Sequence, residues 1–514
     1  MPEDTEKGDM VFISTASDIH CYNIRRVSAY LKKAGYGTKI IFLPQPFAKR
    51  YSQQVLSKVV EFCKDTRLIG LSLMSNYWDN AVQLIKAIRS KYDIPIIGGG
   101  SHPSTHPEQC LEEVDMICVG EGDDTLLELL TRIKENNSDY SGIPNLYYKR
   151  DGQIVRNELA LFDKVDQIPI PDFDLEDHFI LFEGKIQPMT PDLFRCFYGE
   201  TYSTQFSFGC PYTCSFCIHN IYNKRFKFRF RKRPIQNVLE ELRYIKTKFP
   251  FFDQLRIDDD TFFFYSKEDL EYFRDQYKEH VNIPIYVTGG QPMVIKEELL
   301  RPLVEAGMNR IRMGIESGAE RIQDMYQRRI TNRKIIEACK IMNKFKGLGI
   351  TYDFILDNPW ETEEETMQTL KLILEIPHPY GLSLFSLTFY PNTDIHLKAI
   401  EDGIVSADDQ SVGKHYYSIK NTYLNLMYYI CDMRWIPKRF KLFLLKDSVR
   451  NSRFKPVIVF VLRLNRLIRN KMGLTKYLWK YIARMDYIRI RFSIKKYLND
   501  RRYYYSIKSS VLGS

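Results

Sequence analysis

The sequence lacks the features that mark several special classes of protein. No apolar run comes near the ~20 residues of a membrane-spanning helix, and the longest runs, such as residues 456–462, are far shorter. We find no internal repeat, no low-complexity segment and no N-terminal stretch that resembles a secretion signal. Ten cysteines in 514 residues is ordinary usage for a reducing compartment, so we expect a cytoplasmic protein without disulfides.

Length, composition and charge place the chain among folded multidomain proteins. It is 44% hydrophobic and 27% charged, and 514 residues are too many for one ordinary core, so two or three domains are expected. The formal net charge of +10 is unevenly spread. Residues 411–514 hold 24 of the 74 Lys and Arg but only four of the 64 Asp and Glu, which gives this region +20 and the rest −10.

Residues 10–130 alternate short apolar strands with helices. Strands are predicted at residues 10–14, 38–43, 68–73, 94–100 and 116–122, with a helix at 78–91 among those between them. Continuous apolar strands alternating with helices indicate a doubly wound parallel sheet, an α/β fold whose ligands lie at the carboxyl ends of the strands. Two of these ends are rich in glycine, at residues 98–100 and 120–122. No G-x-G-x-x-G dinucleotide fingerprint follows the first strand.

The rhythm resumes after a stretch that contains Pro169, Pro171, Pro188 and Pro191. We predict a linker at 141–200, a second α/β domain at 201–400 and a basic, mostly helical region at 401–514. Six strands are expected in the second domain, at 204–209, 255–260, 285–288, 310–315, 351–356 and 382–389. Six βα units fit an open or partial parallel barrel, (βα)6, whose site lies at the carboxyl ends of its strands. A cysteine loop and the acidic triplet Asp258–Asp260 lie at such ends.

Three cysteines are the most informative residues of the chain. In the segment CPYTCSFC, Cys210, Cys214 and Cys217 could hold a cubane iron–sulfur cluster and leave its fourth iron without a protein ligand. A structural zinc site would show a second pair of Cys or His at a matching distance, and His219 is too close to Cys217 to serve well. The spacing therefore favours an open cluster.

The same segment resembles the C-x3-C-x-aromatic-C signature of the radical S-adenosylmethionine (SAM) enzymes. In that family the open iron of a [4Fe–4S] cluster binds the methionine end of SAM. The resemblance implies that Phe216 packs against the adenine and that Glu316, in a G-I-E-S-G segment, faces SAM. The triplet Asp258–Asp260 would line the site, and we assign it no role. The alternative is that its side chains point alternately inward and outward at the strand end, so that one carboxylate is buried. Asp357 and Trp360 stand where relatives have glycine.

The segments GGGSHPSTHPE and VDMICVGEGDDTLLEL resemble the cobalamin-binding domain that precedes many radical SAM domains, here at 1–140. On that resemblance seven residues lie near the corrin or its nucleotide tail: Ser72, Ser75, Gly99, Gly100, His102, Gly120 and Glu121. The D-x-H-x-x-G motif, whose histidine ligates cobalt in other cobalamin proteins, is absent. Residues 18–20 begin like it, but the required glycine is missing. A cobalt without a lower histidine and a loss of cobalamin are both compatible with the sequence.

Two basic segments remain. Residues 225–233, RFKFRFRKR, alternate with a strand period, which indicates a barrel-edge strand with a buried phenylalanine face and a solvated basic face rather than a nucleic-acid site. The C-terminal region, with amphipathic stretches at 435–445 and 477–492, either covers a substrate or docks on a polyanion or on the inner face of the membrane.

The two resemblances together imply an enzyme that cleaves SAM to a 5′-deoxyadenosyl radical and methylates an unactivated carbon from cobalamin. The alternatives are a cobalamin-linked cyclase, rearrangement or oxidation enzyme, and a non-enzymatic sensor or binding protein. The expected partners are a small-molecule or lipid-like substrate and a one-electron reductant such as a flavodoxin or ferredoxin. No nucleic acid is expected.

Overall fold

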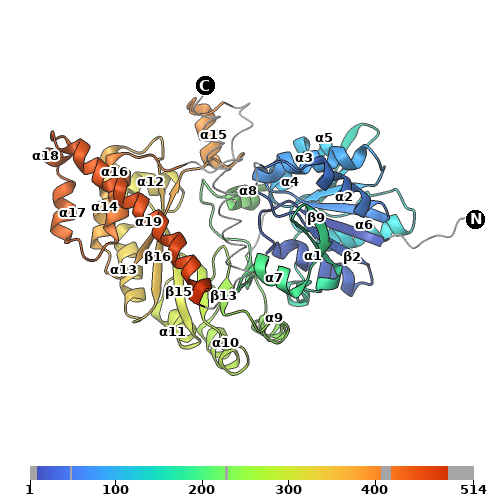
Figure 1. Cartoon of the computed structure of the whole chain (residues 1–514), viewed down its shortest axis with the longest axis horizontal. Coiled ribbons are helices and arrows are strands. Elements are labelled where there is room, and N and C mark those ends of the chain that lie inside the picture. The colour runs from blue at the N-terminus through green and yellow to red at the C-terminus, as the bar shows by residue number, and fades with distance from the viewer. Residues whose placement is uncertain (1–7, 47–48, 226–229, 407–417, 484–514) are drawn as a thin grey trace, which may run out of the picture. The chain divides into compact units, whose positions relative to one another are not determined.

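The computed structural model of the chain describes residues 8–46, 49–225, 230–406 and 418–483 (Figure 1). The chain divides into two compact units. The first consists of residues 1–200 together with 224–228, and the second takes up the other described residues from 201 onward.

The first unit is built on a nine-stranded sheet in the order β7-β6-β5-β4-β3-β1-β2-β8-β9. The six inner strands, in the order β5-β4-β3-β1-β2-β8, pair in parallel. At one edge β6 and β7 join antiparallel, and at the other edge β9 does. The five central strands are β1 (Gly8–Ser14), β2 (Thr38–Phe42), β3 (Thr66–Ser72), β4 (Ile96–Gly99) and β5 (Met116–Cys118). Their side chains are mostly buried on both faces, which is why they read as continuous apolar runs.

Helices pack in two groups against this sheet. Helix α1 contacts α6, while α2 contacts α3 and α3 contacts α5, as expected for a doubly wound fold. The bounds are α1 Tyr22–Lys33, α2 Gln53–Cys63, α3 Trp78–Arg89, α4 Ser101–Thr105, α5 Pro107–Glu113 and α6 Asp123–Lys134. The predicted parallel α/β domain is confirmed.

The segment 141–200, predicted as a linker, is instead part of the first unit. Two hairpins extend the sheet at opposite edges: β6 (Leu146–Arg150) with β7 (Gln153–Arg156), and β8 (His178–Phe182) with β9 (Lys185–Pro188), followed by α7 (Pro191–Tyr198). The prediction was wrong because the prolines mark turns and element ends, while Leu146 and Ile180 are fully buried in the sheet.

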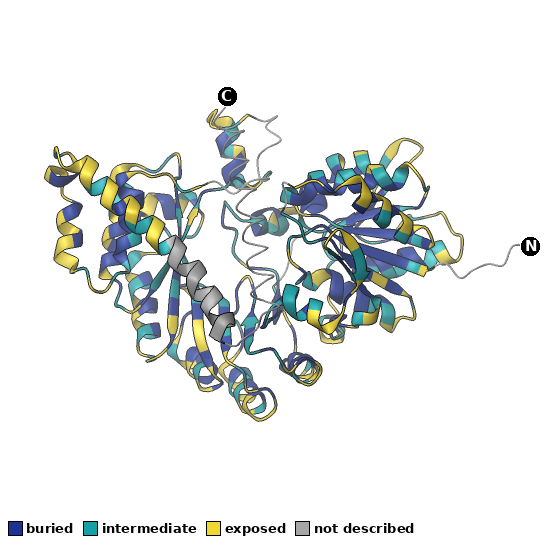
Figure 2. Cartoon of the chain, in the orientation of Figure 1, coloured by how far each residue is buried: buried dark blue, intermediate teal, exposed yellow. Residues whose placement is uncertain are grey.

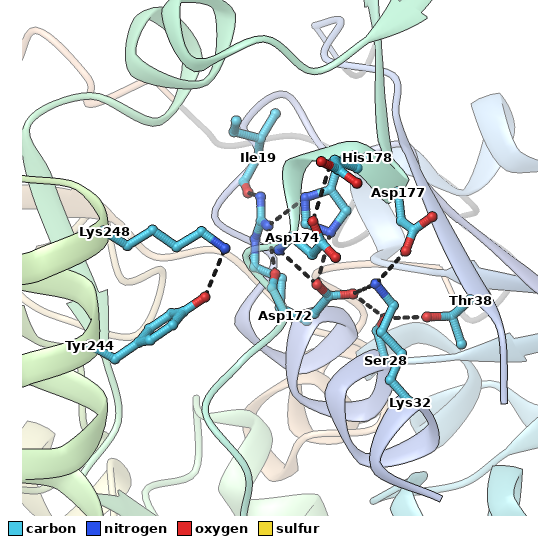
Figure 3. A network of polar contacts seen from close by, with 12 residues as sticks. Ile19, Ser28, Lys32, Thr38, Asp172, Asp174, Asp177, His178, Tyr244 and Lys248 are labelled. Carbon is cyan, nitrogen blue, oxygen red and sulfur yellow. Dashed lines mark hydrogen bonds and ion pairs between the residues drawn. The ribbon is translucent and has the colours of Figure 1, made fainter. Parts of the chain in front are cut away.

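A buried polar cluster connects α1 to the segment that leads into β8 (Figure 3). The guanidinium of Arg25 is fully buried and donates to the carbonyl of Asp172 at 3.0 Å. The Asp172 carboxylate accepts from Ser28 at 2.6 Å and pairs with Lys32 at 3.1 Å. Burial lowers the pKa of His178 to about 4, whereas the hydrogen bond and charge of its neighbours hold the pKa of Asp172 far below its usual value.

The second unit contains a six-stranded parallel sheet in the order β10-β13-β14-β15-β16-β17. The strands are β10 (Thr201–Thr204), β13 (Gln254–Ile257), β14 (Ile285–Gly290), β15 (Met308–Glu316), β16 (Gly349–Leu356) and β17 (Gly381–Ser386). The helices between and after them are α9 Ile235–Lys248, α10 Lys267–His280, α11 Glu297–Glu305, α12 Glu320–Met325, α13 Asn332–Asn343, α14 Glu363–Glu375 and α15 Asp394–Glu401. In the described part of the chain β10 does not pair with β17, so the barrel is open, as expected from six βα units.

Two strand predictions in this unit need correction. The strand expected at 204–209 ends at Thr204, because Asp259 accepts hydrogen bonds from the Phe206 N–H and the Ser207 hydroxyl and turns the chain aside. Ser207–Phe208 forms β11, which pairs antiparallel with β12 (Arg231–Lys232).

Residues 225–233 do not form one amphipathic strand. Arg225 ends helix α8 (Ile218–Arg225), and residues 226–229 lie outside the described residues. Arg233 is not solvated but fully buried, where its guanidinium pairs with Glu241 at 2.7 Å. A buried partner on α9 overrides the charge pattern of the segment.

The C-terminal region is helical, as predicted. It forms α16 (Tyr423–Cys431), α17 (Lys438–Leu444), α18 (Asp447–Arg450) and α19 (Lys455–Ala483), while residues 484–492 of a predicted amphipathic stretch lie outside the described residues. Helix α16 is largely buried and contacts α14 of the barrel, whereas α17 and the start of α19 are mostly exposed (Figure 2). None of the described helices is long and apolar enough to span a membrane.

Candidate active site

The three cysteines lie in a loop that leaves β11 and enters α8. Cys210 and Cys214 are buried and Cys217 is half-buried. The first turn of the loop is fixed from α8, because the Asn223 amide donates to the carbonyls of Cys210 at 2.8 Å and Tyr212 at 2.9 Å. The loop therefore presents three thiols from a backbone that α8 holds in place.

The middle of the loop is fixed from the other side by the end of α12. The Ser215 N–H donates to the Tyr326 carbonyl at 3.1 Å, and the Ser215 hydroxyl donates to the Met325 carbonyl at 2.7 Å. The ring of Phe216 packs edge-on against Tyr326, with centroids 5.1 Å apart. Phe216 is half-buried beside an apolar cluster around Ala319 and Leu387, so part of its ring remains accessible.

The thiols are shielded from water. Burial raises the pKa of Cys210 and Cys217 to about 12 and also raises that of Cys214, so the thiols are protonated at neutral pH without a metal. Among the described residues no three His, Cys, Asp or Glu side chains converge on a single ion. A cubane does not require this, because each thiolate binds a different iron, and iron binding would displace the thiol protons.

Arg328 is the buried cation of this site. Its Nη1 lies 3.9 Å from Cys214 Sγ and 3.6 Å from Glu316 Oε1, and its Nη2 donates to the Gly314 carbonyl at 2.7 Å. The side chain is 3% exposed, and its Nε has no hydrogen-bond partner among the described residues. A cation held here offsets negative charge on a thiolate cluster, so the loop and its surroundings fit a [4Fe–4S] cluster.

Sequence reasoning missed Arg328. It lies between Gln327 and Arg329, both of which have left-handed backbone conformations with φ of 56° and 49°. Such paired strain in non-glycine residues is typical of functional loops. No local pattern distinguishes Arg328 from its arginine neighbour.

Glu316 ends β15 in a strained conformation, with φ of 71°. Burial raises the pKa of its carboxyl to about 7, although the Arg328 guanidinium opposes this shift. The carboxylate folds back over Gly314, where a Cβ would collide with Glu316 Oε1. A Cβ at Gly318 would lie 2.8 Å from the Thr369 Cα, so the last glycine of the G-I-E-S-G segment has a steric reason, and the segment places a titratable carboxyl beside the cysteine loop.

The acidic triplet splits into different environments. Asp259 is buried and holds the start of β11, and burial raises its pKa to about 8. Asp258 pairs with Arg256 at 2.6 Å. Asp260 Oδ2 lies 2.8 Å from Nε2 of His219, the residue two positions after Cys217. Of the two predictions for the triplet, the one in which a single carboxylate is buried agrees with the structure, and the buried residue is Asp259.

The end of β16 departs from the glycine pattern in an informative way. Asp357 keeps the left-handed conformation that glycine would adopt, with φ of 62°. Its two carboxylate oxygens accept from the Asn425 amide at 2.7 Å, the Ser386 hydroxyl at 2.9 Å and the Lys420 N–H at 3.0 Å. Asp357 therefore fastens the C-terminal region to the carboxyl end of the barrel. Trp360 is half-buried, and its indole N–H donates to Asp402 at 2.7 Å.

In the first unit, the predicted residues gather at the carboxyl ends of three neighbouring strands, β3, β4 and β5. Ser72 is in register with Gly99. A Cβ at Gly99 would meet nothing within 4 Å, whereas one at Gly100 would collide with the Leu73 carbonyl. Met74, directly after β3, is 43% exposed. An open glycine ledge beside an exposed apolar side chain fits one face of a flat ligand such as a corrin.

Three of the predicted residues, Ser75, His102 and Glu121, also have contacts within the protein, and Gly120 has a constrained backbone. His102 is buried, lies 3.1 Å from the Ser75 hydroxyl through its Nδ1, and packs its ring on Trp78 at 4.7 Å. Gly120 has φ of 94°, which requires glycine. The Glu121 carboxylate accepts the Phe162 N–H at 3.0 Å. These contacts shape the carboxyl ends of the strands. That the predicted residues contact cobalamin remains a prediction.

Comparison with known proteins agrees with both halves of this description. The family model "B12 binding domain" matches residues 8–130, and the model "Radical SAM superfamily" matches residues 204–373. The chain therefore combines a B12-binding domain with a radical SAM domain. These two domains imply a [4Fe–4S] cluster, SAM and cobalamin as cofactors, as predicted.

Curated relatives and solved structures extend the likeness. An uncharacterized methyltransferase of Pyrococcus horikoshii is 27% identical over 66% of this chain and 71% of its own length. An anaerobic magnesium-protoporphyrin IX monomethyl ester cyclase of Rubrivivax gelatinosus is 23% identical over 67% of this chain and 60% of its own length.

Two solved structures share the fold of the radical SAM protein described here. The cobalamin-dependent radical enzyme OxsB, with aqua-cobalamin and SAM bound, gives a TM-score of 0.67 at 16% identity over 96% of this chain and 84% of its own. The methyltransferase TsrM of Kitasatospora setae, with a tryptophan substrate and a SAM analogue, gives 0.62 at 18% identity over 76% of each chain.

Proposed function

We propose that this protein is a cobalamin-dependent radical SAM methyltransferase that methylates an unactivated carbon. The observation that carries the proposal is that one chain combines a B12-binding domain with a radical SAM domain whose cysteine trio is intact. When bound, the cluster and SAM supply a hydrogen-abstracting radical, and cobalamin supplies a transferable methyl group.

The residues of the chain have defined parts in this proposal. Cys210, Cys214 and Cys217 would hold the cluster, and Arg328 would offset its charge. Glu316, when ionised, would accept hydrogen bonds from the hydroxyls or amino group of SAM. Phe216, which is half-buried, would pack against the adenine, and the buried loop around these groups would limit the access of water.

The first unit would hold the corrin. The half-buried residues Ser72, Gly99 and Gly120 form a continuous edge at the ends of β3, β4 and β5, with Met74 exposed beside them. The protein orients both cofactors and excludes side reactions of the radical, while the bond-making chemistry belongs to the cofactors.

A cobalamin-linked cyclase is the second candidate, favoured by the likeness to the magnesium-protoporphyrin ester cyclase. The two reactions differ in the fate of the SAM methyl group. A methyltransferase consumes SAM in two ways, giving S-adenosylhomocysteine when cobalamin is methylated and 5′-deoxyadenosine when the radical forms. A cyclase yields 5′-deoxyadenosine without methyl transfer.

The test uses anaerobically reconstituted protein, reduced cobalamin and methyl-deuterated SAM. We expect deuterated methylcobalamin on the protein together with S-adenosylhomocysteine, both detected by mass spectrometry, and slow formation of 5′-deoxyadenosine after reduction. Formation of 5′-deoxyadenosine with cobalamin bound but never methylated would reject the methyltransferase and favour the cyclase. The variant with all three cysteines changed to Ala is the control, because it should methylate no carbon and form no 5′-deoxyadenosine.

The partners follow from this chemistry. We infer a small-molecule or lipid-like substrate and a flavodoxin- or ferredoxin-like reductant. We also infer a peripheral contact of the basic C-terminal region with the inner face of the membrane.

A further inference from the structure

Over residues 455–469, helix α19 is inverted relative to an ordinary amphipathic helix: Asn465, Arg466 and Arg469 face the protein, and a row of large apolar side chains faces solvent. The inward side is held by polar contacts to the preceding segments. The Arg469 guanidinium makes a bidentate ion pair with Asp432 at 2.7 and 2.8 Å, and Asn465 donates to the Tyr429 carbonyl at 3.3 Å.

Arg466 completes this inward side. Its guanidinium donates to the Ile419 carbonyl at 3.1 Å and to the Asn421 side chain at 2.9 Å, and it lies over the Tyr429 ring at 5.0 Å. Leu462 is the one side chain of residues 455–469 that is fully buried. These contacts fix the rotation of the helix about its own axis.

The outward side carries a stripe of large apolar side chains at helical spacing. Their exposed fractions are 61% for Val457, 67% for Phe460, 56% for Val461, 47% for Leu464, 59% for Leu467 and 49% for Ile468. A soluble helix normally turns such a stripe toward the core. Here the ion pair and the hydrogen bonds of the opposite side keep it outside, so it is available to a partner.

The exposed charged residues that precede the stripe in the sequence and lie within it are mostly basic. Seven exposed Lys or Arg residues lie between 434 and 463, against one exposed acid, Asp447, whose carboxylate already contacts Arg450: Arg434, Lys438, Arg439, Lys446, Arg453, Lys455 and Arg463. Further apolar side chains are exposed before α19, including Trp435 at 78%, Phe440 at 51% and Phe443 at 48%. Aromatic and aliphatic side chains among basic residues are the composition of a helix that lies in a membrane interface.

We propose that α19 docks on an anionic lipid bilayer, with the stripe Val457–Ile468 inserted at the level of the acyl chains and the surrounding Lys and Arg on lipid phosphates. This gives a structural basis to the membrane contact inferred under the proposed function and does not depend on the methyl transfer. Charge complementarity selects the occupant: a second copy of the chain would bring its own basic residues against those of the first. Each basic residue near an anionic surface contributes roughly a fivefold gain in partitioning.

The test is co-sedimentation of the full chain with vesicles of phosphatidylcholine, with and without phosphatidylglycerol. We expect binding only with phosphatidylglycerol, weakened by high salt. The double variant Phe460→Ser and Leu464→Ser should bind at least tenfold more weakly at low salt. The matched control is Leu397→Ser on α15, because Leu397 is 51% exposed but lies outside the stripe. It should bind as the unchanged protein does.

Several results would overturn the proposal. If the double variant binds as well as the unchanged protein, charge alone drives adsorption and the stripe is not inserted. If the unchanged protein binds no vesicle but elutes as a dimer that the double variant converts to a monomer, the stripe is an interface between copies. Circular dichroism of the double variant shows that a loss of binding is not a loss of folding.

Discussion

Asp357 offers a sharp test of how the C-terminal region is held on the barrel, because the resemblance to radical SAM enzymes predicts glycine at this position and glycine tolerates its left-handed backbone. Asp357→Gly keeps the left-handed backbone and removes only the side chain. The variant loses three hydrogen bonds, to Ser386, Lys420 and Asn425. At about 1 kcal/mol each for a half-exposed carboxylate, the loss is about 3 kcal/mol. Relief of the left-handed strain returns about 1 kcal/mol.

The net expectation is that the attachment of α16 is about 2 kcal/mol less stable, which corresponds to a roughly thirtyfold larger equilibrium constant for local opening. Hydrogen exchange of the amides of Tyr423–Cys431 measures this opening directly. The amides of α2 in the first unit are the internal control and should not change.

Asp357→Asn is the matched variant. It keeps the size and the tolerance for a left-handed backbone, but its amide nitrogen can no longer accept from a donor. We expect an intermediate increase in exchange. Unchanged protection of α16 in the glycine variant would refute the idea that Asp357 fastens this region.

Other expectations follow from the same structure. Glu316, with its pKa of about 7, should bind SAM roughly tenfold more tightly at pH 8 than at pH 6, and Glu316→Gln should remove this dependence, as measured by calorimetry. The folded pKa of His178 lies below its unfolded value, so the free energy of unfolding should fall by up to about 3 kcal/mol as the pH drops from 6.5 to 4. Urea titrations at several pH values measure this change, and the unfolding free energy of His178→Gln should vary less with pH. Arg233→Met leaves Glu241 buried without a cationic partner, although the hydroxyls of Tyr202 and Thr204 still donate to it, and thermal denaturation should show a loss of about 3–5 kcal/mol in the free energy of unfolding. Iron and sulfide analysis after anaerobic reconstitution should find no cluster in the triple Ala variant at Cys210, Cys214 and Cys217.

The sequence was informative where chemistry imposes a spacing. The parallel sheets follow from apolar strands that alternate with helices, and the cysteine loop and Glu316 follow from short motifs. Arg328 could not be found this way. It reaches Cys214 and Glu316 from a loop more than a hundred residues beyond the cysteines, and neighbouring arginines have the same local pattern.

The corrected segments share one physical cause, which is a partner distant in sequence. Residues 141–200 look like a linker because prolines interrupt them, yet Leu146 pairs with Cys118 and Ile180 with Phe42, each more than twenty residues away in the sequence. Arg233 looks solvated because it ends a basic run, yet Glu241 neutralises it in the interior. Local patterns report propensity, and buried partners override it.

In the C-terminal region too, a partner distant in sequence overrides the local pattern. Its sequence reveals an apolar stripe and an excess of positive charge, and a stripe of this kind predicts a helix that packs by its apolar face. The rotation of α19 is instead set by Asp432, a half-buried carboxylate that an arginine of the helix must satisfy. An unpaired carboxylate in that position would cost more than an exposed apolar side chain, which surfaces tolerate singly. Six such side chains in one row are harder to tolerate in water, and for that reason the stripe indicates a surface that is covered when the protein works.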